Sequence, residues 1–254
     1  MRLENKNILV IGAGGLLGSE VVKSLLGSGA KVIATDIDTD NLASKLEKMG
    51  IDKHNSNLSM QNIDITDENT TKSFFNLINN IDGVVNCAYP KNKTYGAHFY
   101  DVSLASFNEN IALHLGSTFL ITQQCAAYFS KHNKALSLVN ISSIYGVVAP
   151  KFDIYENTAM TMAVEYAAIK SALLHLNKYV VAYVKNSNFR INSISPGGLL
   201  DGQHESFLQA YKTKTLGQGM LEPKDMMGAI IFLLSDSSQY INCQNIIIDD
   251  GFTL

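Results

Sequence analysis

A short apolar run, a cluster of glycines and an amphipathic segment follow one another near the start of the chain, and this order constrains its fold most. Residues Ile8–Ile11 have β character, and Leu16–Leu26 carries its apolar side chains at helical spacing. Four glycines lie at the junction: Gly12, Gly14, Gly15 and Gly18. Glycines let the backbone approach a pyrophosphate, and the free N–H groups and dipole of a helix N-terminus hold it. The sequence therefore predicts a strand–turn–helix unit with an anion site.

The glycine spacing departs from the strict G-x-G-x-x-G fingerprint of dinucleotide-binding turns. Leu17 stands where the last glycine of that fingerprint belongs, and Gly12, Gly15 and Gly18 form a G-x-x-G-x-x-G series instead. A plain turn between a strand and a helix is therefore the alternative interpretation of this stretch.

An acidic residue after the second predicted strand favours NAD as the ligand of this turn. The strand covers Lys31–Ala34, and Asp36 closes it. A carboxylate there can accept hydrogen bonds from both hydroxyls of an adenosine ribose, and it repels a 2′-phosphate. The glycine turn contains no Arg or Lys to bind that phosphate. The alternative for Asp36 is an N-cap or loop acid in the run 36–40.

Strands and helices alternate along the rest of the chain. This pattern predicts an α/β fold: a single-domain, Rossmann-type, doubly wound parallel sheet of about seven strands with helices on both faces. A long helix is expected over Val102–Ser130, and Pro223 is expected to open another that ends at Leu234. No repeat or long linker divides residues 1–254. The chain is therefore predicted to be one domain.

Bulk composition excludes several classes of protein. A net charge of −3 gives no basis for nucleic-acid binding. No apolar run approaches the roughly 20 residues that a membrane span requires, so no membrane partner is expected. Cys87, Cys125 and Cys243 stand far apart, which indicates a reducing cytoplasm rather than a disulfide framework or a metal site.

Tyr166 and Lys170 lie four residues apart in a segment of helical pattern. That spacing places the phenol and the ammonium on one helix face, a turn apart. A nearby ammonium favours the phenolate and is expected to lower the tyrosine pKa from about 10. The pair is a candidate general acid/base; the alternative is a surface pair that shares a helix by chance.

Taken in order along the chain, these landmarks resemble the short-chain dehydrogenase/reductase family. The matching stretches are Gly12 to Gly18, Asp36, Asn86-Cys87-Ala88, Asn140-Ile141-Ser142-Ser143, the Tyr166/Lys170 pair and Pro196-Gly197. The resemblance implies hydride transfer between NAD and a substrate carbon that bears a hydroxyl or carbonyl. It also implies a set of catalytic residues: Asn110, Ser143, Tyr166 and Lys170. The implied cofactor contacts are Gly12, Gly14, Gly15, Leu16, Leu17, Gly18, Asp36, Ile37, Asp64, Ile65, Asn86, Cys87, Ala88, Tyr166, Lys170, Pro196, Gly197 and Leu199.

The resemblance also assigns roles within the catalytic set. Lys170 is expected to lower the tyrosine pKa and to bind the nicotinamide ribose, and Ser143 to bond the substrate oxygen. Asn110 is expected to hold a water that links Lys170 to bulk solvent. Two alternatives stay open: Asn110 as an ordinary polar helix residue, and Ser142 in the place of Ser143.

The chain departs from the compact branch of the family at several points. Tyr89 replaces a glycine and is expected to line the cleft, and Val147–Ala163 is an insertion. The glycine spacing and Ile144-Tyr145-Gly146 resemble the extended branch, which acts on nucleotide sugars. Only 84 residues follow Lys170, however, which favours the compact branch. Two alternatives are a nucleotide-sugar epimerase or dehydratase with recycled NAD, and a non-catalytic NAD-binding sensor.

The substrate is expected to be a small, sugar-like molecule. The segment Gly198–Gly219 resembles the substrate lid of the family, and a basic rim is expected around the cleft. Its members would be Lys91, Lys93, Tyr95, Lys151, His204, Lys212 and Lys214. Such a rim suits a hydroxylated or phosphorylated sugar; the alternative is a set of solvated surface lysines. The insertion resembles bacterial oxidoreductases of surface-sugar pathways, such as flagellin modification.

A homotetramer or homodimer is expected, because family members pair through the long helices. In this chain those helices correspond to the predicted Val102–Ser130 helix and to the helix that carries Tyr166. Apolar positions such as Leu120 and Val180 are compatible with that pairing.

Overall fold

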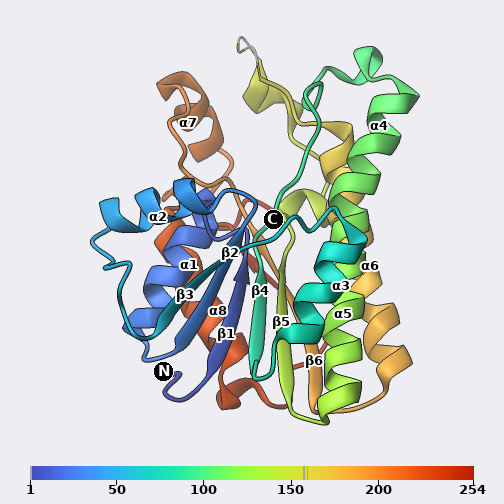
Figure 1. The fold of residues 1–254 in the computed structure, drawn as a ribbon. Coiled ribbons are helices and arrows are strands. Elements are labelled where there is room, and N and C mark those ends of the chain that lie inside the picture. Colours follow the sequence, from blue (N-terminus) through green and yellow to red (C-terminus); the bar gives the residue numbers. More distant parts are fainter. Residues whose placement is uncertain (1, 157, 159) are drawn as a thin grey trace.

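A parallel seven-stranded sheet runs through the centre of the computed structural model, which describes residues 2–156, 158 and 160–254 (Figure 1). In spatial order the strands are β3 (Leu58–Asn62), β2 (Lys31–Asp36), β1 (Asn7–Ile11), β4 (Gly83–Asn86), β5 (Leu136–Ile141), β6 (Phe189–Pro196) and β7 (Asn245–Ile248). All six neighbouring pairs are parallel. The predicted fold class, a doubly wound sheet in one domain, is confirmed.

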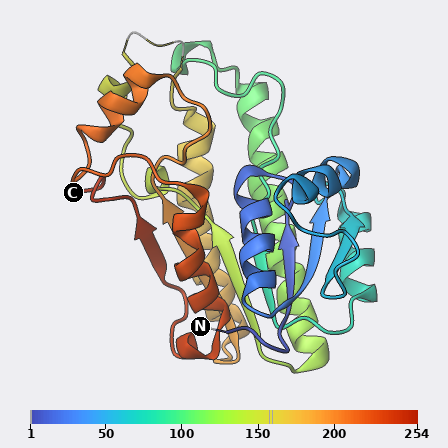
Figure 2. The same cartoon turned by 90° about the vertical axis from the view of Figure 1, so that its left-hand side faces the viewer.

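Helices cover both faces of the sheet (Figures 1 and 2). One face packs against α1 (Leu16–Gly27), α2 (Thr39–Lys48) and α8 (Met227–Leu234). The other packs against α3 (Glu68–Leu77), α5 (Ser117–His132) and α6 (Val164–Val184). The first strand shows why: Ile8 and Val10 point into the first layer, whereas Leu9 and Ile11 point into the second. Strands buried on both faces are continuously apolar, as parallel sheets require.

The long helix expected over Val102–Ser130 is interrupted. It consists of α4 (Leu104–Asn110), a π-helical segment at Ile111–Gly116, and then α5. A π-helical turn holds an extra residue, so it rotates every later side chain relative to an unbroken α-helix. The helix expected to begin at Pro223 also differs, because Pro223–Met226 is a 3₁₀ turn and α8 begins only at Met227.

The strand order reverses direction at β1, because β2 and β4 lie on either side of it. Ligands of open α/β sheets bind at such a switch point, outside the carboxyl ends of the strands. Two further segments rise beyond that edge: α7 (Glu205–Lys212) and the insertion Val147–Ala163, of which Asn157 and Ala159 lie outside the described residues.

A small apolar cluster joins these two segments to the end of the chain. Its buried members are Ile144, Tyr145, Ile154, Phe207, Tyr211 and Phe252. The segments therefore form a packed wall over the sheet edge. No helix within the described ranges has the length and apolar character that a membrane span needs.

Candidate active site

One cavity of about 1180 Å³ follows the carboxyl edge of the sheet. It begins at the glycine turn after β1 and passes the ends of β4, β5 and β6. It ends among residues of the insertion and of α7, such as Met160 and Phe207. The cavity is therefore large enough for a dinucleotide together with a small substrate.

The glycine turn requires glycine at two places. Gly12 has a φ of +75°, and a Cβ there would lie 2.7 Å from the Cα of Ala88. A Cβ on Gly18 would lie 2.0 Å from the carbonyl oxygen of Gly12, so the first turn of α1 packs directly on the strand exit. Gly15 caps α1 without a side-chain hydrogen bond, which leaves the first N–H groups of the helix free for an anion. The turn fits a pyrophosphate.

Asp36 meets this turn from the end of β2. Its Oδ2 accepts a hydrogen bond from the Gly14 N–H at 2.8 Å, and its Oδ1 accepts one from Asp38 N–H at 3.2 Å. Lys45 of α2 donates from Nζ to the Gly14 carbonyl oxygen at 3.3 Å. The sequence analysis did not find this lysine, because only the fold brings it to the turn. Asp36 itself still lines the cavity.

Most of the residues expected to contact the cofactor line the cavity: Gly12, Gly14, Gly15, Leu16, Leu17, Asp36, Ile37, Asp64, Ile65, Cys87, Ala88, Tyr166, Lys170, Pro196, Gly197 and Leu199. Gly18 and Asn86 do not line it. Gly18 packs beneath the turn, and Asn86 is buried, with its Nδ2 donating to Asn140 Oδ1 at 3.3 Å. Both support the site from behind. Within the described ranges, no group of three or more His, Cys, Asp or Glu could hold a metal ion.

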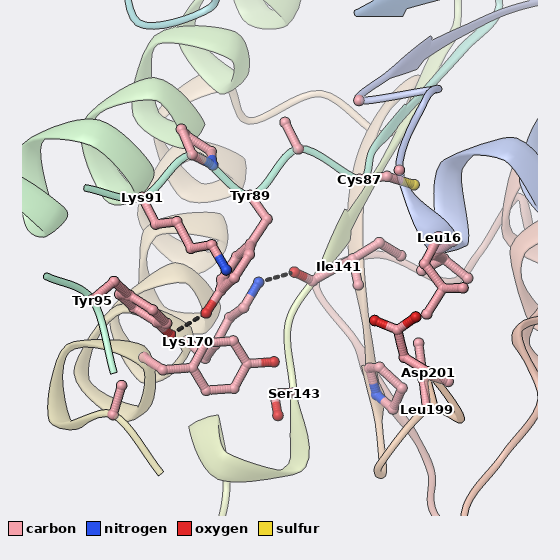
Figure 3. Close-up of a pocket in the computed structure, with 18 of the residues that line it drawn as sticks. Leu16, Cys87, Tyr89, Lys91, Tyr95, Ile141, Ser143, Lys170, Leu199 and Asp201 are labelled. Carbon is pink, nitrogen blue, oxygen red and sulfur yellow. Dashed lines mark hydrogen bonds between the residues drawn. The ribbon is translucent and has the colours of Figure 1, made fainter. Parts of the chain in front are cut away.

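Tyr166, Ser143 and Lys170 all line the cavity. Figure 3 shows the side chains of Ser143 and Lys170 within it. Ser143 lies near enough to the Tyr166 phenol to lower its pKa, and its Oγ accepts from Tyr145 N–H at 3.2 Å. Lys170 Nζ donates to the Ile141 carbonyl oxygen at 2.8 Å, and lies 5.4 Å from the centre of the Tyr166 ring. The neighbouring Ser142 is committed elsewhere, because its Oγ donates to the backbone carbonyl of Lys170 at 2.9 Å. The geometry favours Ser143 over Ser142.

The expected lowering of the tyrosine pKa was wrong. Burial raises the pKa of Tyr166, although the hydrogen bond from Ser143 acts in the lowering direction. Burial also lowers the pKa of Lys170 to about 7, against a raising effect of Cys87. Desolvation of the buried phenol and of the buried ammonium disfavours both charged forms. The phenol is therefore protonated at neutral pH and suited to donate a proton.

Asn110 does not meet Lys170. Its Oδ1 accepts from Asn92 N–H at 3.0 Å, and its Nδ2 donates to Ser106 O at 3.0 Å and lies 3.4 Å from Glu165 Oε1. The group beside the lysine is instead His114, whose Nε2 lies 3.4 Å from Lys170 Nζ. His114 is buried in the π-helical segment. The sequence analysis missed it, because the break in the helix is not visible in the residue spacing.

Tyr89 lines the cavity, as expected, and organises one wall of it. Its ring packs edge-on against Tyr166 at 5.5 Å and against His114 at 4.8 Å between centroids. Its hydroxyl bonds that of Tyr95, and Lys91 Nζ lies 5.6 Å and 5.5 Å from the two ring centres (Figure 3). This wall combines two phenols and one cation.

Another part of the cavity lining is apolar, which the sequence did not indicate. It consists of Met160 and Met162 from the insertion, Phe207 from α7, and Met220. Six residues of the expected lid, Gly198–Gly219, line the cavity: Gly198, Leu199, Asp201, Gln203, Phe207 and Tyr211. The movement of this segment as a lid stays a prediction.

The expected basic rim is narrower than the sequence indicated. Lys91 and Tyr95 line the cavity, but the other members do not. Lys151 Nζ donates to the Phe252 carbonyl oxygen at 2.6 Å, and Lys214 pairs with Asp153 at 2.5 Å. His204 caps α7 through Ser206. The rim is therefore reduced to one cation beside two tyrosines.

The fold and the site together define a nicotinamide-dinucleotide oxidoreductase of the Rossmann type. The chain matches the family described as Enoyl-(Acyl carrier protein) reductase over residues 12–253. It belongs to the short-chain dehydrogenase/reductase family, and it is an enzyme of that class.

Relatives span the whole chain. It is 35% identical to "Post-translational flagellin modification protein A" of Campylobacter coli, over 99% of this chain and 100% of that one. It is 27% identical to a 7alpha-hydroxysteroid dehydrogenase of Bacteroides fragilis, over 100% of this chain and 96% of that one. Among solved structures, a short chain dehydrogenase from Leptospira borgpetersenii with bound NAD+ superposes with a TM-score of 0.84 at 31% identity, covering 100% of this chain and 94% of that one.

Removal of the phenol tests the site directly. Tyr166→Phe should leave NADH binding intact and lower turnover by at least about a hundredfold, the scale of a lost general acid/base. Steady-state kinetics and NADH fluorescence titration measure the two effects. Tyr240→Phe, an exposed tyrosine outside the cavity and outside α5 and α6, is the control and should change neither. Turnover of Tyr166→Phe close to that of the wild type would remove Tyr166 from the mechanism.

Proposed function

We propose that the enzyme uses NAD to interconvert a hydroxyl and a carbonyl group on a sugar, a sugar phosphate or a nucleotide sugar. The observation that supports this most is the convergence of Tyr166, Ser143 and Lys170 in one cavity. The far end of the same cavity is a glycine turn that fits a pyrophosphate. A reacting carbon beside the phenol would therefore lie within reach of a dinucleotide laid along the sheet edge.

When bound, a nicotinamide dinucleotide exchanges hydride with the carbon that bears the substrate oxygen. In reduction, the Tyr166 phenol donates its proton to the carbonyl oxygen; in oxidation, the phenolate takes the hydroxyl proton. The Ser143 hydroxyl donates a hydrogen bond to the same oxygen as negative charge develops there. The Lys170 ammonium supplies positive charge beside the phenolate.

Asp36 supports NAD over NADP. Its carboxylate lines the adenosine end of the cavity and is held toward Gly14, where it would repel a ribose 2′-phosphate. Lys45 is close, but its Nζ bonds the Gly14 carbonyl oxygen and does not line the cavity. The Leptospira relative was solved with bound NAD+.

Removal of the carboxylate should reverse this preference. Asp36→Ala should weaken NADH binding by about tenfold or more, the value of a charge-assisted hydrogen bond, and strengthen NADPH binding. Fluorescence titrations with both cofactors measure the change. Asp52→Ala, which removes an exposed carboxylate outside the cavity, is the control. Tighter binding of NADPH than of NADH to the wild-type enzyme would contradict the proposed role of Asp36.

The wall of Tyr89, Lys91 and Tyr95 supports a hydroxylated substrate with an anionic group. Lys91 takes part in no ion pair among the described residues, so its ammonium is available to an anion at the cavity wall. The two phenols can donate to hydroxyl or phosphate oxygens. Similarity to a protein named for post-translational flagellin modification agrees with the surface-sugar pathways that the sequence resembles. The apolar wall around Met160 leaves room for a less polar part of the same substrate.

A panel of sugars and nucleotide sugars, each tested with and without its phosphate, examines this assignment. Incubation with NAD should release NADH for at least one phosphorylated compound, with a higher kcat/KM than for its unphosphorylated partner. The absence of NADH from every compound would contradict the sugar assignment. Enzyme that retains NAD through purification and converts a nucleotide sugar without NADH release would indicate an epimerase or dehydratase instead.

Lys91 provides the matched variant for this panel. Lys91→Ala should raise KM for the phosphorylated substrate by about tenfold with little change in kcat, because a charge-assisted contact is lost. Lys93→Ala, two residues away and outside the cavity, should leave both constants unchanged. An unchanged KM in Lys91→Ala would remove the cation from substrate binding.

We propose that the enzyme is a homodimer or homotetramer built through α5 and α6. Leu120 and Val180 are buried in the protomer and cannot form a partner surface. Aromatic side chains on the same helices are exposed instead: Phe119 by 47%, Tyr179 by 65% and Tyr183 by 79%. Sedimentation should report two or four times the chain mass of 27.8 kDa. A stable monomer would contradict this assembly.

A further inference from the structure

A buried histidine lies beside the proposed acid/base pair and has no role in the mechanism above. His114 is only 2% exposed and belongs to the π-helical segment Ile111–Gly116. Single π-helical turns are rare, and they occur frequently at functional sites. The imidazole packs edge-on against Tyr89, which in turn packs against Tyr166. The position of the ring is therefore fixed on the side that faces the cavity wall.

The contact between His114 and Lys170 has a defined polarity. Lys170 Nζ lies 3.4 Å from His114 Nε2 and donates to the Ile141 carbonyl oxygen at 2.8 Å. An ammonium has three donors and no acceptor, so a hydrogen bond here requires Nε2 to be bare and Nδ1 to carry the imidazole proton. A charged imidazolium at this distance would repel the ammonium, and both groups are buried.

We propose that His114 is a positioning residue: its neutral imidazole, protonated at Nδ1, accepts a hydrogen bond from Lys170 and holds the ammonium beside the Tyr166 phenol. This inference rests on the proposed acid/base role of that pair. Asn110, one turn earlier, cannot take this place, because its carboxamide is bonded to Asn92 and Ser106.

Among the groups that face Lys170 and His114, the imidazole of His114 is the hydrogen-bond acceptor that a substitution can remove. Cys87 and Tyr89 come from the segment after β4, and both are neutral when protonated. The Glu165 carboxylate on α6 is directed to Asn110. The Ile141 carbonyl oxygen is backbone and cannot change its charge. Loss of the imidazole would therefore remove the one side-chain acceptor that Lys170 has among the described residues.

The charge of Lys170 near neutral pH depends on such acceptors. Burial lowers the pKa of Lys170 to about 7, so a lost hydrogen bond favours the neutral amine further. A weaker positive charge raises the pKa of the phenol beside it. Alcohol oxidation needs the phenolate, so its rate increases with pH through that pKa. Without His114 the rise should therefore occur at higher pH.

Nuclear magnetic resonance of enzyme labelled with ¹⁵N-histidine tests the proposal without a substrate. His114 should be neutral with its proton on Nδ1 between about pH 5 and pH 7, where an ordinary histidine titrates. The His114→Gln variant assigns the resonance by its disappearance. Titration of His114 within this range, or a proton on Nε2, would overturn the proposal. This outcome is independent of whether the substrate is a sugar.

Kinetics of two variants test the consequence, with whichever alcohol the enzyme oxidises. His114→Phe keeps a ring against Tyr89 but has no acceptor. It should lower kcat at neutral pH by about tenfold and move the rise of the pH profile to higher pH by about one pH unit. His114→Gln offers a carboxamide oxygen near the place of Nε2. It should restore kcat to within about threefold of the wild type and return the rise of the pH profile to its wild-type position. KM should stay within about twofold in both variants.

A merely structural role predicts a different result. Both variants would then lose thermal stability and leave the shape of the pH profile unchanged, and Gln would not restore activity. An unmoved profile in a folded His114→Phe enzyme overturns the proposal. If His114→Phe does not fold, the comparison of His114→Gln with the wild type and the tautomer measurement still decide, because both use folded protein.

Discussion

The rest of the site depends on how residue 170 is held at the end of β5. The Lys170 ammonium donates to the carbonyl of Ile141, and the Lys170 carbonyl accepts from the hydroxyl of Ser142. The same turn of α6 packs on Gly146, where a Cβ would lie 2.7 Å from the Lys170 carbonyl carbon. Three short contacts thus fix α6 against the strand exit. They place Tyr166 beside Ser143 before any ligand binds, which is the preorganisation that acid/base chemistry requires.

A buried chain of polar side chains supports this junction from behind. Asn86 donates to Asn140 at 3.3 Å, Asn140 to Asn177 at 2.9 Å, and Asn177 to Ser193 at 2.7 Å. The chain crosses β4, β5, α6 and β6, and each bond satisfies an amide that would be costly to bury unpaired. A shift of α6 along the sheet would break several of these bonds together. The polar chain therefore fixes the register in which the lysine meets the strand end.

Much of this could be predicted from the sequence, because it depends on local patterns. Apolar runs and glycine positions were sufficient to predict the parallel sheet and the strand–turn–helix unit at its start, and a four-residue spacing was sufficient to place Tyr166 and Lys170 on one helix face. The pairing of His114 with Lys170 could not be predicted, because the π-helical segment rotates the later residues away from the α-helical register. The predicted basic rim included too many residues for a related reason: Lys151 and Lys214 have partners that only the fold brings to them.

The electrostatics of the pair also follow from burial rather than from spacing. A phenolate and an ammonium stabilise each other only while both groups are charged. Here burial raises the pKa of Tyr166 and lowers that of Lys170 to about 7. Burial therefore disfavours both the phenolate and the ammonium. A neutral amine gives the phenolate no positive charge, so the pKa of the phenol depends on the charge of Lys170. The acceptors around Lys170 therefore adjust the proton affinity of the phenol without touching it.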